Sequence, residues 1–151
     1  HVWVEGTING ARLTIASGKF PENSSTNTNI IVNNDLSYTN YNGTDVLALI
    51  AQNNILVGKN SDNDLELDAA LVAKNGFVGR YYYNSSCTNN SRNSLRLVGM
   101  IATNQRYGFA YTDGTGYATR TIIYDANLLY GPPPSFPLTS DQYQTISWRE
   151  L

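Results

Sequence analysis

One five-residue phrase occurs three times in this chain and constrains its fold more than any other feature. The copies are LIAQN at 49–53, LVAKN at 71–75 and MIATN at 100–104, each with two bulky apolar residues, an alanine, a variable residue and an asparagine. The alanines lie 22 positions apart in the first interval and 29 in the second. Recurrence every roughly 20 to 30 residues is typical of repeat architectures, in which each unit buries its apolar face against the next.

The segments around the phrase have the pattern of strands rather than of helices. Short runs of β-branched and aliphatic residues end at Asn, Gly, Asp or Ser, which tolerate turns. Leu65 and Leu67 alternate with Glu66 and Asp68, which indicates a strand with one buried and one solvated face. Helix is least unfavourable at 64–74, but the companion copies of the phrase favour strand there too. The sequence therefore predicts an all-β chain.

Strands that recur with Asn and Gly corners predict a short right-handed β-solenoid, formed by 1–151 as a single domain. Successive coils of such a fold place equivalent residues above one another, about 4.8 Å apart. We therefore interpret Asn53, Asn75 and Asn104 as ladder positions of the scaffold, not as ligand-binding or catalytic groups. A jelly roll or another β-sandwich is the structural alternative.

Two segments depart from the repeat. The longer interval contains RYYYNSSCTNNSRNS, which predicts a polar, Tyr-rich insertion loop at about 80–94. The segment at about 124–151 holds three consecutive prolines and several aromatic residues. Proline cannot continue a central strand ladder, and solenoid ends expose unpaired edges. We therefore predict a Pro- and aromatic-rich C-terminal cap.

Several stretches resemble a known family. They are DVLALIAQNNILV, LELDAALVA, LRLVGMIATNQRYGFAY and the ending TIIYDANLLYGPPPSFPLTSDQYQTISWREL, of which the ending is the most specific. Together they resemble the C-terminal β-solenoid domain of PilX-like, type IV pilus-associated proteins of the minor-pilin or competence type. The resemblance covers roughly 4–149. It implies an extracellular, cell-surface location and pilus or other surface subunits as partners, and it supplies no catalytic residues.

Charge is segregated along the chain. No Asp or Glu occurs from 69 to 112, whereas five basic residues and several tyrosines do. Arginine beside aromatic rings suits a phosphate backbone with stacked bases, or an acidic glycan. The predicted ligand-binding residues are Lys74, Arg80, Tyr81, Tyr82, Tyr83, Arg92, Arg96 and Arg106. DNA and acidic glycans are the expected ligands, and ordinary surface charge is the alternative interpretation.

Carboxylates cluster in NSDNDLELD at 60–68 and allow two further interpretations. The oxygen ligands suit Ca²⁺, but the stretch lacks the glycine and spacing of a calcium loop, so a solvated strand face is favoured. Asp64, Glu66 and Asp68 share one strand face, and carboxylate pairs act as acid and base or nucleophile in polysaccharide-cleaving enzymes. The single cysteine excludes an internal disulfide, and we expect no cofactor and no metal.

The chain has no apolar run near the ~18 residues that a membrane helix needs, so no membrane segment is expected in it. The sequence predicts a non-enzymatic extracellular module of a type IV pilus-associated surface protein, acting in adhesion or in the capture of DNA or glycan. A carbohydrate-active β-helix enzyme, lyase or hydrolase, is one alternative. A structural filament subunit is the other.

Overall fold

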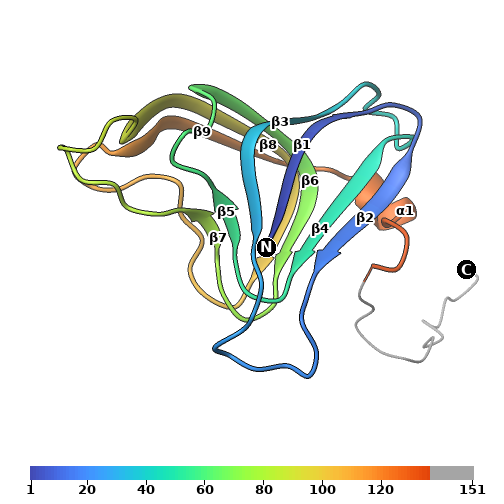
Figure 1. Ribbon diagram of the computed structural model, residues 1–151. Coiled ribbons are helices and arrows are strands. Elements are labelled where there is room, and N and C mark those ends of the chain that lie inside the picture. Colours follow the sequence, from blue (N-terminus) through green and yellow to red (C-terminus); the bar gives the residue numbers. More distant parts are fainter. Residues whose placement is uncertain (137–151) are drawn as a thin grey trace, which may run out of the picture.

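The computed structural model describes residues 1–136, and almost all regular structure in this part is strand (Figure 1). The elements are β1 (Val2–Ile8), β2 (Arg12–Ser17), β3 (Ile30–Tyr38), β4 (Val46–Ala51), β5 (Ile55–Val57), β6 (Asp64–Ala73), β7 (Val78–Arg80), β8 (Ser91–Thr103), β9 (Gly116–Tyr124) and α1 (Asn127–Tyr130). The all-β prediction is confirmed for these residues. The segment at 64–74, where helix was least unfavourable, forms β6.

Every pairing between these strands is parallel, and the pairs form three rows. The first row runs β1–β3–β5–β7. The second contains the ends of β1 and β3, the first half of β6, the matching part of β8, and β9. The third contains β2, β4 and the second halves of β6 and β8. Strands distant in sequence therefore lie side by side, each on its counterpart from the preceding repeat.

The repeated phrase sets the register in one interval and misses it by one residue in the next. Ala51 pairs with Ala73, as the 22-residue spacing predicts. Ala73 pairs with Thr103 rather than with Ala102, so the third copy is shifted by one position. Side chains alternate along a strand, so a one-residue shift moves the alanine of the third copy to the opposite face.

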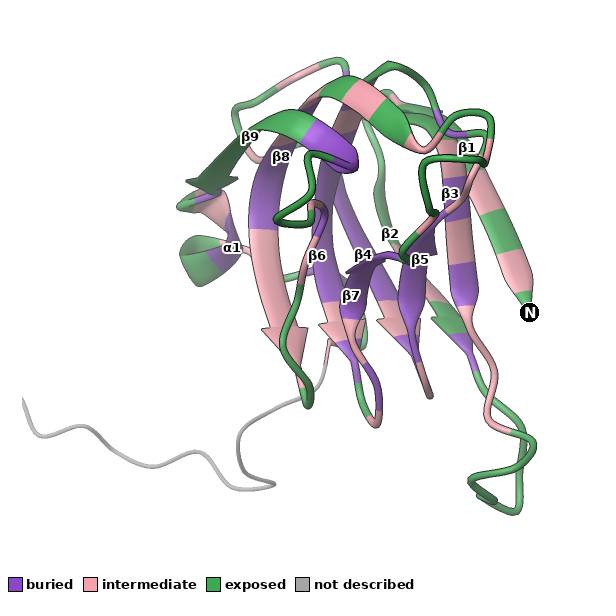
Figure 2. Cartoon of the chain, turned by 90° about the vertical axis from the view of Figure 1, so that its left-hand side faces the viewer, coloured by how far each residue is buried: buried purple, intermediate pink, exposed green. Residues whose placement is uncertain are grey.

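The core lies between the rows and consists of aliphatic side chains that alternate with outward polar ones. Figure 2 shows buried residues concentrated on β4, β5, β6 and β7, whereas β1 at the edge carries exposed ones. Leu67 and Leu97 stack in adjacent strands and are almost fully buried. The same holds for Leu49 and Leu71 in the third row. Burial of such stacked columns is the main favourable term for a fold of this kind.

The segment after β9 covers the outer side of the third row. Leu128 of α1 and Phe136 pack with Val46, Ala48 and Ala70. Arg12 of β2 donates hydrogen bonds to the carbonyl oxygens of Gly131, at 2.5 Å, and Pro132, at 2.9 Å, and the hydroxyl of Thr14 donates to the carbonyl of Pro134. Of the predicted cap at 124–151, the described part thus lies across an outer sheet surface. Residues 137–151 lie outside the described residues.

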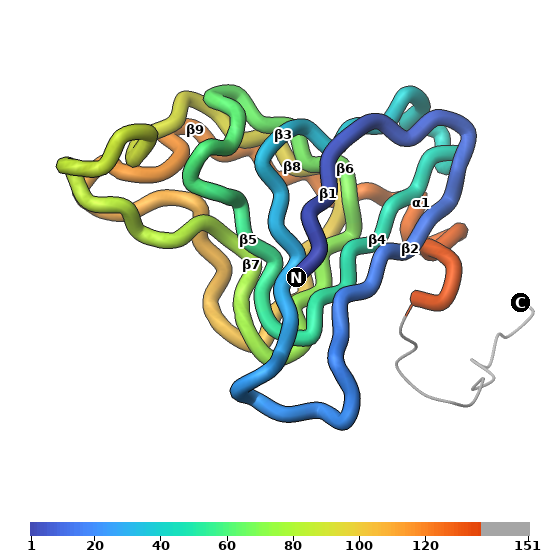
Figure 3. Tube along the Cα trace, viewed as in Figure 1, coloured from blue at the N-terminus to red at the C-terminus, as the bar shows by residue number. Residues whose placement is uncertain are grey.

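The predicted insertion at 80–94 contains a shorter loop. Arg80 ends β7 and Ser91 begins β8, so the loop itself is 81–90. In Figure 3 this yellow-green loop projects at the left of the view, at the end of the molecule away from β2 and α1. Among the described residues, no helix has the length and apolar character that crossing a bilayer requires.

Candidate functional site

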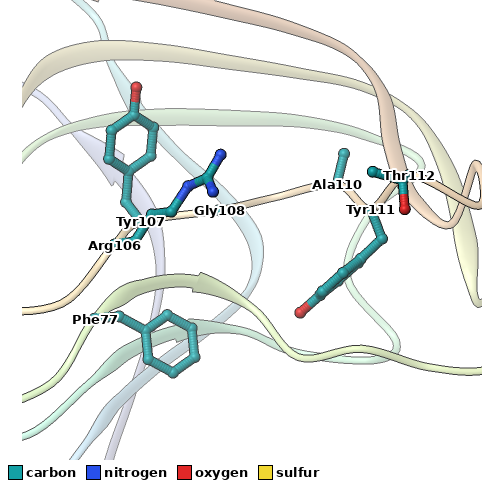
Figure 4. A pocket seen from close by; sticks show the side chains of 7 residues that line it. All are labelled: Phe77, Arg106, Tyr107, Gly108, Ala110, Tyr111 and Thr112. Atoms are coloured by element: carbon teal, nitrogen blue, oxygen red, sulfur yellow. The ribbon is translucent and has the colours of Figure 1, made fainter.

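A hollow on the outer side of the first row forms a pocket near the predicted contact face. Along this row, successive outward positions are Trp3, Ile31, Leu56, Gly79 and Gly108. The last two carry no side chain, so the surface sinks there. The resulting pocket measures about 370 Å³ and is lined by Phe77, Arg106, Tyr107, Gly108, Ala110, Tyr111 and Thr112 (Figure 4). We call these seven residues the aromatic pocket.

The two glycines have different roles. A Cβ on Gly79 would lie 2.1 Å from the carbonyl oxygen of Gly108, so the two backbones approach too closely for any side chain. A Cβ on Gly108 would meet nothing within 4 Å, because it would point into the open pocket. Gly79 is therefore required for the close approach of the two backbones, and Gly108 for the depth of the pocket.

Two aromatic pairs flank the pocket. Phe77 meets Tyr81 edge-on with ring centroids 5.6 Å apart, and Tyr82 meets Tyr111 in the same way at 5.1 Å. Tyr82 remains 52% exposed and Tyr107 remains 48% exposed. Edge-to-face contacts hold rings in place without covering their faces. The aromatic surface is therefore both ordered and open to solvent.

Hydrogen bonds from the scaffold position these rings. The side-chain oxygen of buried Asn54 accepts from the backbone N–H of Phe77 at 2.9 Å. The hydroxyl of Tyr111 donates to the carbonyl oxygen of Arg80 at 2.8 Å, and that of Tyr82 donates to Asp113 at 2.9 Å. The bond to the carboxylate raises the pKa of Tyr82, and burial raises that of Tyr111. Both phenols are thus fixed in the neutral, hydrogen-bonded form.

Arg106 is the charged member of the aromatic pocket. Its side chain is exposed and makes no hydrogen bond or ion pair with any residue in 1–136. In the view of Figure 4, the rings of Phe77 and Tyr111 lie below the 106–112 segment, and the ring of Tyr107 and the guanidinium of Arg106 lie above it. A planar guanidinium next to aromatic rings is suited to bind an anionic group that also offers a flat or apolar face.

The other predicted basic residues do not join Arg106 in one patch. Arg80 is fully buried, and its guanidinium donates to the carbonyl oxygens of Asn90 and Lys59, each at 2.9 Å, and Asn89, at 2.5 Å. Its prediction as a surface contact is corrected on that ground. The alternation of β7 points its side chain inward, where it anchors the loop 81–90, and Tyr83 lies against it with 4.9 Å between the guanidinium carbon and the ring centre.

Three further basic residues are bound to partners elsewhere. Lys74 forms an ion pair with Glu22 at 2.5 Å. Arg92 is half-buried and donates to the carbonyl oxygen of Lys59 at 3.3 Å. Arg96 pairs with Glu66 and approaches Asp68 at 3.4 Å. The continuous charge that the sequence suggests is therefore divided among separate contacts.

Arg96 belongs to a second polar group, which we call the acidic cluster and which consists of Tyr41, Glu66, Asp68 and Arg96. The side chain of Asp68 is fully buried and accepts hydrogen bonds from the backbone N–H of Tyr38 at 2.9 Å and the hydroxyl of Tyr41 at 2.6 Å. Burial raises the pKa of Asp68. Burial, together with the bond to Asp68, raises the pKa of Tyr41 to about 12.

The predicted carboxylate face at 60–68 is thus divided as well. Asp64 accepts from the side chains of Asn93 and Ser94, at 2.6 and 2.5 Å, which lowers its pKa. Glu66 and Asp68 join the acidic cluster. Within residues 1–136, no group of three or more His, Cys, Asp or Glu side chains is placed to hold a metal ion.

Two of the three repeated asparagines bind backbone groups of the neighbouring repeat, whereas the side chain of Asn53 makes no hydrogen bond within residues 1–136. The side chain of Asn75 donates to the carbonyl of Gln52 at 2.9 Å, and that of Asn104 to the carbonyl of Asn75 at 3.3 Å. The buried stack is formed by Asn29, which accepts from the N–H of Asn54 at 3.0 Å, and by Asn54 in turn. These asparagine side chains therefore bind backbone groups rather than one another.

Sequence reasoning missed Phe77, Gly79 and Gly108 as parts of a site. A signal for them is present, because a glycine follows the phrase's asparagine by four positions in the last two copies, at Gly79 and Gly108. That shared spacing matches their observed pairing. Comparison with known protein families, with curated proteins and with solved structures found no match for this chain.

Proposed function

We propose that this chain is a short β-solenoid that serves as a non-enzymatic, cell-surface binding module and captures its ligand at the aromatic pocket. The solenoid interpretation is supported by the three parallel rows, in which each coil stacks on the previous one near the repeat spacing. The proposed setting, association with a type IV pilus or a similar appendage, depends on the resemblance of the C-terminal sequence.

The observation that carries the binding proposal is the ordered, uncovered aromatic surface around Arg106. Exposed aromatic side chains that gather at a pocket are typical of binding sites. Leaving such apolar surface in contact with water is unfavourable, so a cluster of it marks a surface that a ligand covers. The first row could have continued its outward column of Trp3, Ile31 and Leu56. It has glycine there instead, and aromatic residues surround the gap.

The enzyme alternative finds less support. Its candidate pair includes Asp68, which has no exposed side-chain surface and whose oxygens accept bonds from within the chain. Glu66 is paired with Arg96. A general acid or base must reach the proton that it transfers. Here Glu66 is bound to Arg96, and Asp68 is bound to Tyr38 and Tyr41.

The filament alternative has one supporting observation. In the part of the chain that the structure describes, β1, β2 and β9 each pair along a single side, so their other edges are open. Open parallel edges are able to pair with another copy. Sedimentation velocity at increasing concentration tests this, because end-to-end stacking gives polymers that grow with concentration.

Two substitutions test the binding proposal. Binding of soluble polysaccharides and of an oligothymidylate is measured by affinity electrophoresis and calorimetry. Loss of a stacking ring typically costs about 1–3 kcal/mol, so Phe77→Ala and Tyr107→Ala are each expected to weaken binding roughly tenfold or more. Tyr130→Ala is the matched control, because Tyr130 is 91% exposed and lies outside the pocket.

Two outcomes contradict the proposal. The first is binding that is equally weak in the Tyr130 control, or unchanged in both pocket variants. The second is turnover of any of these polysaccharides that disappears in Asp64→Ala or Asp68→Ala, which supports the enzyme instead.

A further inference from the structure

We propose that the aromatic pocket recognises the carboxylate-bearing sugar of an acidic glycan, with Arg106 binding the carboxylate and the rings of Phe77 and Tyr107 packing against the sugar. This inference rests on the proposed binding function and names the ligand class. It follows from the chemistry of the pocket lining, from its size and from the charge around it.

Arg106 provides unused hydrogen-bond donors at the pocket. Its guanidinium offers several N–H donors in a rigid plane, and within residues 1–136 none of them is used. Such a fork matches the two oxygens of a carboxylate, and the resulting bonds are among the strongest in proteins. Because Arg106 lines the pocket beside aromatic rings, the anion it binds must belong to a molecule that also packs on those rings.

The shape of the pocket and its remaining polar groups suit a sugar. The pocket volume of about 370 Å³ lies at the small end of ligand sites, which suits one or two sugar rings. Gly108 and Ala110 provide a floor of backbone and one methyl group, and the Thr112 side chain stands at the edge. A pyranose has apolar C–H faces and polar hydroxyl edges, so it packs on the rings while its hydroxyls reach Thr112 and solvent.

The number of free cations near the pocket favours an acidic glycan over a nucleic acid. A protein that follows a phosphate backbone needs several free cations along one groove. Here Arg80 is buried, and Lys74 and Arg96 are paired with carboxylates. One unpaired guanidinium matches one carboxylate on a sugar far better than a run of phosphates.

The test uses matched polymers. Polygalacturonate, alginate and hyaluronate are each compared with their methyl-esterified forms, which keep the sugar rings and remove the charge. Loss of a hydrogen-bonded charge pair is expected to weaken binding about 10- to 100-fold, so at least one acidic polymer should bind that much more tightly than its ester. Arg106→Gln should reduce affinity for the acid to about the level of the ester.

Two further variants complete the design. Gly108→Val places a side chain into the open pocket without a backbone clash, and it should abolish binding of both forms. Lys19→Gln is the charge control, because Lys19 is exposed, is absent from the pocket lining and has no side-chain hydrogen bond within residues 1–136. Circular dichroism and urea unfolding verify that each variant is folded.

The results distinguish the two proposals. Equal binding of acid and ester that is insensitive to Arg106→Gln but lost in Gly108→Val overturns the carboxylate inference and leaves the binding function intact. Binding of an oligothymidylate, lost in Arg106→Gln, without binding of any acidic glycan overturns it in favour of nucleic acid. Absence of binding to every polymer in the unaltered chain overturns both.

Discussion

The acidic cluster and the aromatic pocket both place an arginine beside tyrosine, yet they differ in what their polar groups do. In the acidic cluster, Arg96 lies 5.5 Å from the ring centre of Tyr41 and contacts both Glu66 and Asp68. In the aromatic pocket, Arg106 has no such partner among the described residues. Arginine and tyrosine therefore bind other residues of the fold in the acidic cluster, whereas in the aromatic pocket they are open to solvent.

From this difference we expect the acidic cluster to contribute mainly to stability and the aromatic pocket to the proposed binding. A buried polar group that loses its partner costs the fold its full desolvation penalty, whereas an exposed one returns to water at little cost. Substitutions in the acidic cluster and beneath the pocket should therefore unfold the chain more readily. Substitutions in the pocket itself should affect ligand affinity.

The largest difference in the free energy of unfolding is expected between two variants in which an arginine is replaced by methionine, one at buried Arg80 and one at exposed Arg106. Arg80→Met removes the donor to the carbonyl oxygens of Asn89 and Asn90 and one of two donors to that of Lys59, and should lower the free energy of unfolding by about 3–5 kcal/mol. Arg106→Met should change it by no more than about 0.5 kcal/mol. Urea unfolding measures both, and equal losses would contradict the distinction between the two sites.

A smaller effect is expected at the corner beneath the pocket. Asn54→Ala removes the acceptor of the Phe77 N–H and should cost about 1–2 kcal/mol of unfolding free energy. Asn53→Ala is the matched control, with an expected cost below about 0.5 kcal/mol, because its side chain makes no hydrogen bond within residues 1–136. The same urea measurement decides. The interpretation of the buried ladder fails if Asn53 proves the more costly residue.

Removing a single hydroxyl sharpens the comparison further. Tyr41→Phe deletes the donor to buried Asp68 and should cost about 1 kcal/mol. Tyr82→Phe deletes a donor to exposed Asp113 and should cost less than about 0.5 kcal/mol. Thermal or urea unfolding of both variants provides the measurement, and a reversed order would show that the acidic cluster is not the stabilising one.

The smallest effect is a pH dependence from Asp68. Its pKa is raised above the ordinary 3.8, so the folded chain holds this proton more tightly than the unfolded chain does. The stability that this contributes is complete below pH 3.8 and is lost as pH rises through the raised pKa. Glu66 adds to the upward shift, whereas Arg96 and the hydroxyl of Tyr41 oppose it.

The measurement compares the unaltered chain with Asp68→Asn across this pH range. The advantage of the unaltered chain in unfolding free energy should decrease as the pH rises, because the variant has no proton to lose at this position. The carboxylates with lowered pKa, such as Asp64, are common to both chains and cancel in the difference. Parallel stability curves would show that Asp68 titrates normally.

Sequence reasoning recovered the strands and the first register but not the site. Alternation of Leu65 and Leu67 with Glu66 and Asp68 predicted the strand β6 correctly. The prediction of a solvated outward face was wrong for Asp68, which is buried in the acidic cluster. The pairing of Ala51 with Ala73 followed from the spacing of the phrase. The one-residue shift at Thr103 did not, since corners can absorb an extra residue without changing the local pattern.

The candidate site was predicted in part. Tyr81, Tyr82 and Arg106 do lie in or beside the pocket. Arg80 was misassigned because its side chain points inward, although arginine is rarely buried. Proximity in sequence suggested a continuous basic patch, but the partners that neutralise Lys74 and Arg96 come from Glu22 and Glu66, many residues away.

By itself, the sequence determined that this protein forms strands and that they recur at a regular spacing, because the alternation of apolar and polar residues is a local property that each strand carries. The tertiary structure alone decided which charged groups remain free. Parallel pairing of β6 with β8 brings Glu66 to Arg96, and the bridge at the end of the first row brings Gly79 to Gly108; such pairings depend on residues that are neighbours only after folding. The neutralised cluster and the open pocket are therefore consequences of register.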